Sequence, residues 1–305
     1  MKSKLRMNRR HFVKQTLAWS LATAFPVALV NAAAATEKAR AWTFCAFGKP
    51  LQFLSFDELA EFMAELGLDG VEVAVRPGGH VLPERVEEDL PKLVAALKQR
   101  GLEITILTSG INRATQPHAE KVLRTAAKLG IKRYRMLWWQ YDLQQPIRPQ
   151  LDALRPGLRE LVALNREVGI SGLYQNHSGP DMVGAGLWDI YDLIKDFLPQ
   201  DLGLAYDIRH AQVEGGLSWP THFSLVQSHV AAICVKDFVW DNTKVKNVPL
   251  GQGRVNAKIL QMVKASKFRG PISLHVEYGE NTHDRKFFAD AFRQDLATLR
   301  RWLDA

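Results

Sequence analysis

Polar side chains gather at four points in the second half of the chain, each at the end of an apolar run. The four segments are Tyr-Gln-Asn-His (174–177), Asp-Ile-Arg-His (207–210), Val-Lys-Asp (235–237) and His-Val-Glu-Tyr (275–278). Carboxylate, imidazole, amide and ammonium groups of this kind bind divalent ions, move protons or stabilise an oxyanion. The sequence therefore predicts one polar site, provided that the fold brings these segments together.

The apolar runs belong to a regular alternation of strands and helices. Strands are expected at 42–47, 70–75, 103–108, 133–139, 172–177, 203–207, 231–236 and 272–278. A helix-like stretch follows each strand, and this pattern requires parallel pairing with helical crossovers. The first strand is not followed by Gly-x-Gly-x-x-Gly, the signature of a nucleotide-binding open sheet. Eight strand–helix units therefore predict a single-domain (β/α)8 TIM barrel over residues 41–305.

The helices are expected at 56–66, 86–100, 119–129, 149–168, 187–197, 220–228, 256–267 and 285–303. Ser55 is a suitable N-cap for the first of them, and Gly67, Gly101 and Gly130 follow helices as C-terminal stops. The carboxyl ends of all strands in such a barrel open at one mouth. The four polar segments should meet there, under the longer loops 76–85 and 238–254.

The last and the sixth strands contribute the acidic residues of the predicted site. Glu277 ends the last strand, with His275 on the same side by alternation, and is a candidate metal ligand and general base. Asp207 and His210 offer an oxygen and an imidazole nitrogen one turn apart, which suits Mn²⁺, Co²⁺, Mg²⁺ or Zn²⁺. The structural alternatives are a rim glutamate bonded to its neighbour and an aspartate that caps the next helix.

The fifth and seventh strands add further candidates. Gln175 offers a carbonyl oxygen to a metal, and His177 is a candidate catalytic or binding residue; both could instead satisfy backbone groups. Cys234 and Lys236 share one face of strand seven. Lys236 is a candidate for binding a substrate hydroxyl or an enediolate oxygen, with Asp237 bracing it, and a structural Lys–Asp pair is the alternative.

Four residues of the first half are candidate substrate contacts. Glu72 ends strand two, His80 lies in the loop after it, and Arg135 and Trp139 alternate along strand four. A tryptophan at a barrel mouth can stack on a sugar ring, although packing between helix and barrel is its commoner role.

Six segments in strand order make the chain resemble the xylose-isomerase-like TIM-barrel superfamily. That group includes sugar-phosphate isomerases/epimerases, ketose 3-epimerases, inosose dehydratases and endonuclease IV. The segments are Gly-Leu-Asp-Gly-Val-Glu (67–72), Tyr-Gln-Asn-His (174–177), Tyr-Asp-Ile-Arg-His (206–210), Val-Lys-Asp-Phe (235–238), Pro-Leu-Gly-Gln-Gly-Arg-Val-Asn (249–256) and Leu-His-Val-Glu (274–277).

The resemblance implies a divalent metal held by a Glu, an Asp, a His and a Glu from strands five to eight. Asp207 and Glu277 match two of these ligands, and His210 matches a substrate-binding histidine. Gln175 stands where the first glutamate is expected, and Cys234 stands where the histidine is expected. Glutamine cannot serve as a carboxylate base, and cysteine favours softer metals. His177 or His80 as ligand or base, or a site without metal, are therefore open alternatives.

The first 35 residues have the features of an export signal. Asn-Arg-Arg-His-Phe-Val-Lys (8–14) precedes an apolar run at 16–30 and four alanines at 32–35. The adjacent arginines followed by Phe-Val-Lys resemble a twin-arginine signal, with an ordinary secretory signal or a retained anchor as the alternatives. The sequence thus predicts export by the twin-arginine machinery to a bacterial periplasm. No second apolar stretch is long enough to cross a bilayer.

The charge of the chain depends strongly on this leader. The whole sequence has 40 basic and 32 acidic residues, a net charge of +8, but residues 1–35 contain six basic residues and no acidic ones. Removing them leaves 34 basic against 32 acidic residues, a net charge of +2, which gives no electrostatic basis for binding nucleic acid. The two cysteines, Cys45 and Cys234, fall on strands that the eighth strand separates, so two free thiols are expected.

The leading hypothesis is an exported sugar isomerase or epimerase that transfers a proton next to a carbonyl of a polyol or keto-sugar, with a divalent ion or Lys236 stabilising the enediolate. A dehydratase or lyase of the same superfamily is a close alternative. The second class is a catalytically silent carbohydrate-binding barrel, because two expected ligand positions differ. An endonuclease ranks low, since nine histidines, one of them in the leader, leave few ligands for a multi-zinc cluster.

Overall fold

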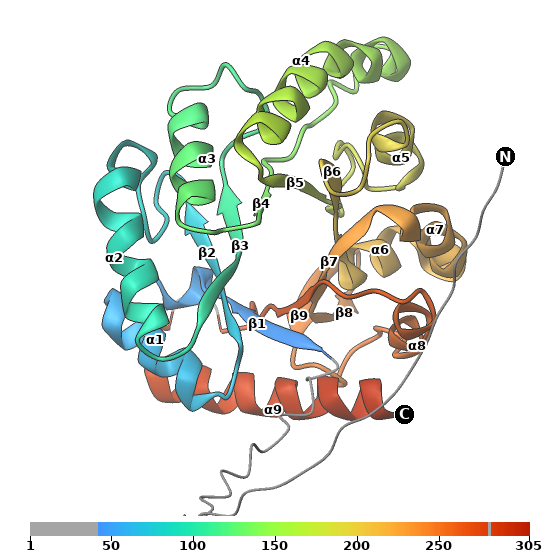
Figure 1. The fold of residues 1–305 in the computed structure, drawn as a ribbon. Coiled ribbons are helices and arrows are strands. Elements are labelled where there is room, and N and C mark those ends of the chain that lie inside the picture. Colours follow the sequence, from blue (N-terminus) through green and yellow to red (C-terminus); the bar gives the residue numbers. More distant parts are fainter. Residues whose placement is uncertain (1–41, 280–281) are drawn as a thin grey trace, which may run out of the picture. The chain divides into compact units, whose positions relative to one another are not determined.

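The computed structural model describes residues 42–279 and 282–305, which include a closed barrel of parallel strands (Figure 1). The strands lie around the barrel in the order β1-β10-β7-β6-β5-β4-β3-β2. Their bounds are β1 (Thr43–Phe47), β2 (Gly70–Val75), β3 (Glu103–Ser109), β4 (Arg133–Arg135), β5 (Ser171–Gln175), β6 (Leu202–Asp207), β7 (Val230–Val235) and β10 (Pro271–Leu274). The predicted (β/α)8 barrel is confirmed.

Helices surround the barrel, and the long C-terminal helix α9 lies across its outside (Figure 1). They are α1 (Phe56–Glu65), α2 (Val86–Lys98), α3 (Ala119–Lys128), α4 (Ile147–Val168), α5 (Trp188–Ile194), α6 (Ile208–Gly215), α7 (Trp219–Val226), α8 (Lys258–Ala265) and α9 (Arg285–Asp304). Each of the eight predicted helices is present, and α6 is an additional one.

Local sequence signals explain where several helices begin and end. The Ser55 side chain accepts from the Glu58 backbone N–H, and the Glu58 carboxylate accepts from the Ser55 backbone N–H, which together form a capping box at α1. Gly67, Gly101 and Gly130 follow α1, α2 and α3 with φ of 63°, 69° and 88°. Glycine adopts this left-handed conformation without a Cβ penalty, so the predicted stops are confirmed.

Two strands end four residues earlier than the sequence predicts. β4 stops at Arg135 rather than at 139, and β10 stops at Leu274 rather than at 278. The apolar pattern continues beyond both ends because Trp139 and Val276 are buried above the barrel, at 7% and 0% exposure. Hydrophobic periodicity reports burial and not strand pairing, so it overestimates strand length wherever the following loop is also buried.

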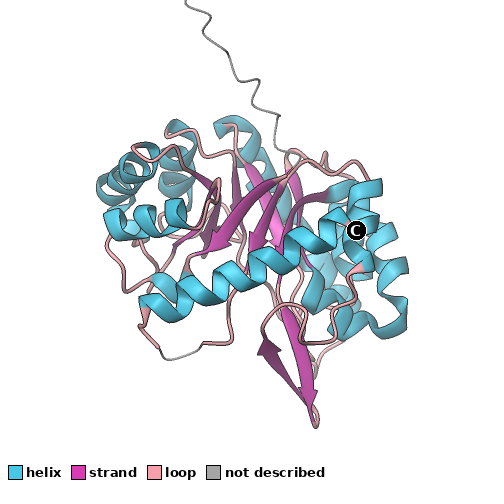
Figure 2. Ribbon diagram, turned by 90° about the horizontal axis from the view of Figure 1, so that it is seen from below, coloured by secondary structure: helices cyan, strands magenta, loops and turns pink. Residues whose placement is uncertain are grey.

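The segment predicted as a long loop at 238–254 contains an antiparallel hairpin, β8 (Asp237–Asp241) and β9 (Lys244–Val248). Figure 2 shows this hairpin standing out from the barrel. Trp240 near its tip is 44% exposed. Asp237 and Phe238 are the only buried residues of the hairpin, and its other residues are exposed or half-buried. It therefore has no continuous buried face, which explains why the sequence did not reveal it.

The predicted loop after strand six is also corrected, because α6 begins immediately after Asp207. The Asp207 carboxylate accepts a hydrogen bond from the His210 backbone N–H at 3.0 Å and caps the helix. The structural alternative for this aspartate, a helix cap, is therefore confirmed. His210 lies in the first turn of α6 and not on a loop.

Side chains fill the lower part of the barrel. Ile106, Leu173, Ala205, Ala232 and Cys234 pack together inside the ring of strands. Any cavity must therefore lie above this layer, at the carboxyl ends of the strands. Both cysteines are buried free thiols, as predicted, and β10 separates their strands.

Two predictions concern the membrane and the leader. Among the described helices, none combines the length and apolarity that a bilayer crossing requires. The predicted twin-arginine signal at 1–35 lies outside the described residues.

Candidate active site

A cavity of about 470 Å³ opens at the carboxyl ends of the barrel strands. It is lined by residues from all four polar segments of the sequence. The predicted residues on its wall are Arg135, Gln175, His177, His210, Lys236 and Glu277. Asp207 is fully buried directly beneath them, in contact with Lys236. The expected convergence of distant segments at one mouth is thus observed, whereas the roles of the individual side chains stay predictions.

The Lys236 ammonium links the two acidic residues of this cavity. Its Nζ donates to Glu277 Oε2 at 2.7 Å and lies 3.3 Å from Asp207 Oδ2. The Lys236 side chain is 8% exposed, and that of Glu277 is 16% exposed. We call Lys236, Asp207 and Glu277 the Lys236 cluster.

Mutual attraction within the Lys236 cluster outweighs the cost of burial. Burial alone would lower the pKa of Lys236, but Asp207 and Glu277 raise it above its ordinary value. Burial would raise the pKa of Glu277, but Lys236 and His275 hold it well below the usual range. The pKa of Asp207 is lowered for the same reason, burial being outweighed by Lys236. The three groups are therefore charged at neutral pH.

Two histidines face the cavity in opposite tautomers. The Gln175 carbonyl oxygen can only accept, so His177 Nδ1, 3.0 Å away, bears the proton and Nε2 has a lone pair. The Ser178 backbone N–H can only donate, so His210 Nδ1 accepts it at 3.0 Å and the proton of the neutral ring lies on Nε2. Burial lowers the pKa of His177 to about 4 and that of His210 well below its ordinary value, so both rings are neutral. His177 thus offers an acceptor and His210 a donor.

Glu72 lies deeper and belongs to a separate network. Its Oε1 accepts from Thr108 at 2.6 Å and pairs with Arg135 at 3.1 Å. Its Oε2 accepts from Ser273 at 2.6 Å and from His275 Nε2 at 3.1 Å. We call these five residues the Glu72 network. Burial would raise the pKa of Glu72, but Arg135 and His275 hold it well below the usual range.

Three of the predicted substrate contacts are absent from the cavity wall. Glu72 is fully buried beneath it. Trp139 is buried and stacks on Tyr174 with ring centroids 5.1 Å apart, and its neighbour Trp138 lines the cavity instead. His80 packs beside Gly48, where a Cβ would come within 2.9 Å of its ring. Direct contact of Glu72, His80 or Trp139 with substrate would require rearrangement of this wall.

Asp237 does not brace Lys236, in contrast to the prediction. Its carboxylate accepts hydrogen bonds from four backbone N–H groups at 2.8–3.0 Å, those of Phe238, Gly251, Gly253 and Val255. A Cβ at Gly253 would come within 2.3 Å of the Asp237 carboxylate, so this loop requires glycine there. Asp237 therefore shapes the 249–256 segment, and the partners of Lys236 are Asp207 and Glu277.

Several cavity residues were not identified from the sequence. Lys49, Arg76, Arg209 and Asn247 all line the wall. Asn247 comes from β9 and donates to the Glu277 carbonyl oxygen at 3.3 Å, so the unpredicted hairpin contributes to the site. Arg76 directly follows β2, and its position after a strand was the available signal.

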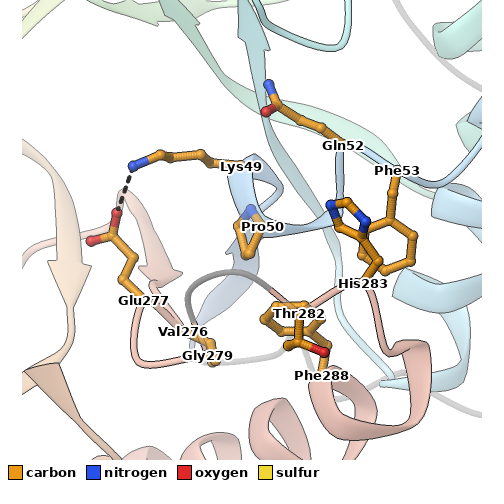
Figure 3. A pocket seen from close by; sticks show the side chains of 10 residues that line it. All are labelled: Lys49, Pro50, Gln52, Phe53, Val276, Glu277, Gly279, Thr282, His283 and Phe288. Atoms are coloured by element: carbon orange, nitrogen blue, oxygen red, sulfur yellow. Dashed lines mark ion pairs between the residues drawn. The ribbon is translucent and has the colours of Figure 1, made fainter.

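A second cavity of about 490 Å³ adjoins the first one and shares Lys49 and Glu277 with it. Figure 3 shows the ion pair between these two side chains, whose Nζ and Oε1 are 3.6 Å apart. The second cavity is lined mainly by Pro50, Phe53, Phe288 and other residues without acid–base groups. The first cavity holds the convergent acids, bases and cations, and we assign the candidate chemistry to it.

The residues at the four implied metal positions do not fit a divalent ion in this arrangement. The Lys236 ammonium already lies between Asp207 and Glu277. Gln175 directs its amide nitrogen, and not its oxygen, to Asp207 Oδ2 at 2.9 Å. A cation between the two carboxylates would have to displace Lys236.

A different group of three could hold a metal. The ligand atoms of Glu72, Cys234 and His275 lie within 4.8 Å of one another, a donor set that suits zinc. Each Glu72 oxygen already has two polar partners, however, and an ion there would compete with His275 and Arg135. Cys234 thus belongs to a ligand group with Glu72 and His275, whereas the resemblance assigned it to one ion with Asp207 and Glu277.

Comparisons with solved structures find several barrels of the same fold. A zinc-bound IolI protein superposes with a TM-score of 0.70 at 15% identity, covering 86% of this chain and 98% of that chain. The D-psicose 3-epimerase of Clostridium cellulolyticum H10 gives 0.65 at 16%, covering 86% and 99%. A probable 3-DHS dehydratase, AsbF from Bacillus anthracis, gives 0.66 at 16%, covering 85% and 98%. Such low identities show a shared fold.

The IolI structure contains zinc, and in this chain Glu72, Cys234 and His275 form a possible metal site. A comparison with curated protein sequences found no match. The sequence profile described as Xylose isomerase-like TIM barrel matches residues 60–302, most of the chain. The chain therefore belongs to the xylose isomerase-like TIM barrel family.

Proposed function

We propose that this protein is an isomerase or epimerase that moves a proton at a carbon next to a carbonyl group of a small hydroxylated substrate, such as a keto-sugar. The observation that supports this most is the Lys236 cluster on the cavity wall, with an ionised carboxylate 2.7 Å from a buried ammonium. A base beside a fixed positive charge is what enolisation requires, because negative charge develops on the carbonyl oxygen.

In the proposed reaction Glu277 removes the proton, and the electron pair of the C–H bond moves toward the carbonyl oxygen. Lys236 and the Nε2–H of His210 donate hydrogen bonds to the resulting enediolate. As Lys236 turns to the substrate oxygen, its hold on Glu277 weakens, which makes the carboxylate a stronger base. Return of the proton to the adjacent carbon, while the hydroxyl proton of that carbon passes to the former carbonyl oxygen, gives an isomer.

In this scheme the use of His177 as a second acid–base group distinguishes an epimerase from an isomerase. Its neutral ring presents an Nε2 lone pair to the cavity. Proton removal by Glu277, with delivery to the opposite face by a His177 ring that has taken up a solvent proton at Nε2, would invert the carbon, as in an epimerase; Glu277 then releases its proton to the solvent. Loss of a hydroxyl group from the neighbouring carbon would instead give a dehydratase, a reaction that begins with the same proton removal. No step is assigned to a metal, because Lys236 supplies the positive charge at the reacting oxygen.

The test is proton exchange in D₂O, followed by NMR with a panel of ketoses, aldoses and sugar acids. The expected result is deuterium at the carbon next to the carbonyl for at least one substrate, with a loss of 100-fold or more in Glu277→Gln. His177→Asn should abolish epimerisation while exchange persists if two bases are used. Undiminished exchange in Glu277→Gln would remove this residue from the mechanism.

A catalytically silent sugar-binding barrel is the second candidate. The observation in its favour is that Gln175 and Cys234 stand at two implied ligand positions and that Lys236 separates Asp207 from Glu277. Binding of a sugar without exchange in D₂O would favour this reading over the enzyme.

We further propose that the protein is exported by the twin-arginine route to a periplasm. The Arg-Arg-His-Phe-Val-Lys sequence at 9–14 supports this proposal. Expression of the chain in a bacterium with and without a functional twin-arginine machinery, followed by N-terminal sequencing of the periplasmic fraction, tests it. Arg9→Lys together with Arg10→Lys should abolish export, and unchanged export would contradict the route.

A further inference from the structure

The candidate active-site cavity has more positive than negative charge. Its wall includes five cationic side chains, Lys49, Arg76, Arg135, Arg209 and Lys236. Three carboxylates lie on or directly beneath it, those of Glu72, Asp207 and Glu277. Of the three histidines that line the wall, His177 and His210 are neutral, and His275 donates through Nε2 to Glu72. The site therefore has an excess of two positive charges, although the chain without its first 35 residues is close to neutral.

Three of the five cations are balanced within the site. The pairs are Lys236 with Asp207 and Glu277, Arg135 with Glu72, and Lys49 with Glu277. Each of these contacts has N···O distances of 3.6 Å or less. The excess charge thus resides on Arg76 and Arg209.

Arg76 and Arg209 have no carboxylate within ion-pair distance among residues 42–279 and 282–305. The structure gives the Arg76 guanidinium no hydrogen bond there, although the side chain is half-buried in the wall. Arg209 is 8% exposed and donates from Nη1 to Ser178 Oγ at 2.9 Å, while its buried Nε has no partner. A buried guanidinium without an anion is costly, so an anionic partner is expected from outside the protein.

We propose that the substrate has an anionic group, a carboxylate or a phosphate, that binds to Arg76 and Arg209. This inference rests on the proposed function, since it names the substrate class of the same site. The guanidinium fork bonds both kinds of oxyanion in the same planar geometry. A cavity of about 470 Å³ accommodates a monosaccharide with one such group. Lys236 and Glu277 are left for the reacting carbon and its oxygen.

The test is binding measured by calorimetry with three probes that differ at one carbon: glucose, glucuronate and glucose 6-phosphate. At least one of the charged probes is expected to bind tenfold or more tightly than glucose, and its affinity should fall as NaCl is raised. Glucuronate against glucose 6-phosphate distinguishes the carboxylate from the phosphate. Equal affinities for the three probes, or binding by none of them at millimolar concentration, would overturn the proposal.

Variants locate the anion. Arg76→Gln should reduce the preference for the charged probe tenfold while the melting temperature stays within a few degrees, because the replaced guanidinium has no ion-pair or hydrogen-bond partner among the described residues. Arg209→Gln should do the same, but it also removes a contact to Ser178 and can affect folding. Arg113→Gln, an exposed arginine away from the wall, is the matched control. A preference unchanged in both Arg76→Gln and a folded Arg209→Gln would contradict the assignment.

The binding experiment is independent of turnover. Anion preference without deuterium exchange would support the inference and contradict the proposed enzyme. Deuterium exchange in neutral sugars without a preference for anionic probes would support the proposed enzyme and contradict the inference about the anionic group.

Discussion

The Glu72 network lies beneath the Lys236 cluster in the barrel mouth. The two groups differ in how completely their polar atoms are hydrogen-bonded. Both Glu72 oxygens have two partners each, from four different side chains. Around the Lys236 cluster, Gln175 Oε1, Arg209 Nε and Asn247 Oδ1 are buried and have no hydrogen-bond partner within residues 42–279 and 282–305. Both regions have buried carboxylates balanced by cations, so charge alone does not separate them.

This difference in hydrogen bonding indicates which of the two regions binds a ligand. A carboxylate whose oxygens are fully hydrogen-bonded within the protein stabilises the structure but has no acceptor position free for a substrate. Buried donors and acceptors without partners around a cavity are satisfied only when a ligand binds there. His275 connects the two regions, because its Nε2 serves Glu72 and its Nδ1 lies 4.0 Å from Glu277 Oε2. We therefore interpret the lower region as the support of the upper one.

The strongest test of this division is Glu72→Gln. It leaves the Arg135 cation buried without its carboxylate, and we expect the free energy of unfolding to fall by about 3–5 kcal/mol. Glu277→Gln, at a partly open site where Asp207 still balances Lys236, should cost much less. Urea unfolding followed by circular dichroism measures both. An equal loss in the two variants would remove the distinction between the regions.

Two adjacent tryptophans sharpen the comparison. Trp139 is 7% exposed and packs on Tyr174, whereas Trp138 is 37% exposed and lines the cavity. Trp139→Ala should lower the free energy of unfolding by about 3 kcal/mol. Trp138→Ala should leave it within about 1 kcal/mol and weaken sugar binding. Thermal unfolding and calorimetric sugar titrations of both variants check this. A larger loss of stability in Trp138→Ala than in Trp139→Ala would contradict the structure.

The neutral histidines predict how stability depends on pH. Burial lowers the pKa of His177 and of His80 to about 4 in the folded protein, below the value of about 6.5 in the unfolded chain. Stability from this source is complete above pH 6.5 and is lost as the pH falls toward 4, since the unfolded chain then binds more protons. The expected loss by pH 5 is about 2 kcal/mol for each histidine, about 4 kcal/mol for the two together. A His80→Asn, His177→Asn double variant should have a flatter profile; an unchanged slope would exclude these two residues as its cause.

The smallest expected effect is that of metal removal. If the Lys236 ammonium acts in place of an ion, dialysis against EDTA should leave the melting temperature and the deuterium exchange unchanged. Elemental analysis before dialysis should find well under one zinc, manganese or cobalt per chain. A stoichiometric zinc that is lost in Cys234→Ser would instead assign an ion to the Glu72–Cys234–His275 group.

The sequence predicted the barrel well because its signals are local. Ser55 and Glu58 define a helix start by themselves, and glycines with positive φ define helix ends. The β8–β9 hairpin was missed because, apart from Asp237 and Phe238, its residues are exposed or half-buried, so no continuous buried face gives it a clear alternation. The α6 helix was missed because the polar segment at 207–210 was taken for a loop.

The site was predicted less completely because its contacts depend on three-dimensional detail. Strand ends identified Asp207, Lys236 and Glu277, but not that Lys236 would lie between the other two. Asp237 precedes a loop whose backbone donors satisfy it, and no pattern in the sequence states this. Arg76 and Arg209 are conspicuous only when the partners of every other cation have been identified.

A crystal structure of the protein with bound glucuronate tests the central claim most directly. We predict that the sugar lies in the cavity between Glu277 and His177, with its carboxylate against Arg76 or Arg209 and a ring or carbonyl oxygen on Lys236. Glucuronate bound in the adjacent cavity beside Phe53 and Phe288, with no contact to Lys236 or to either arginine, would contradict the account.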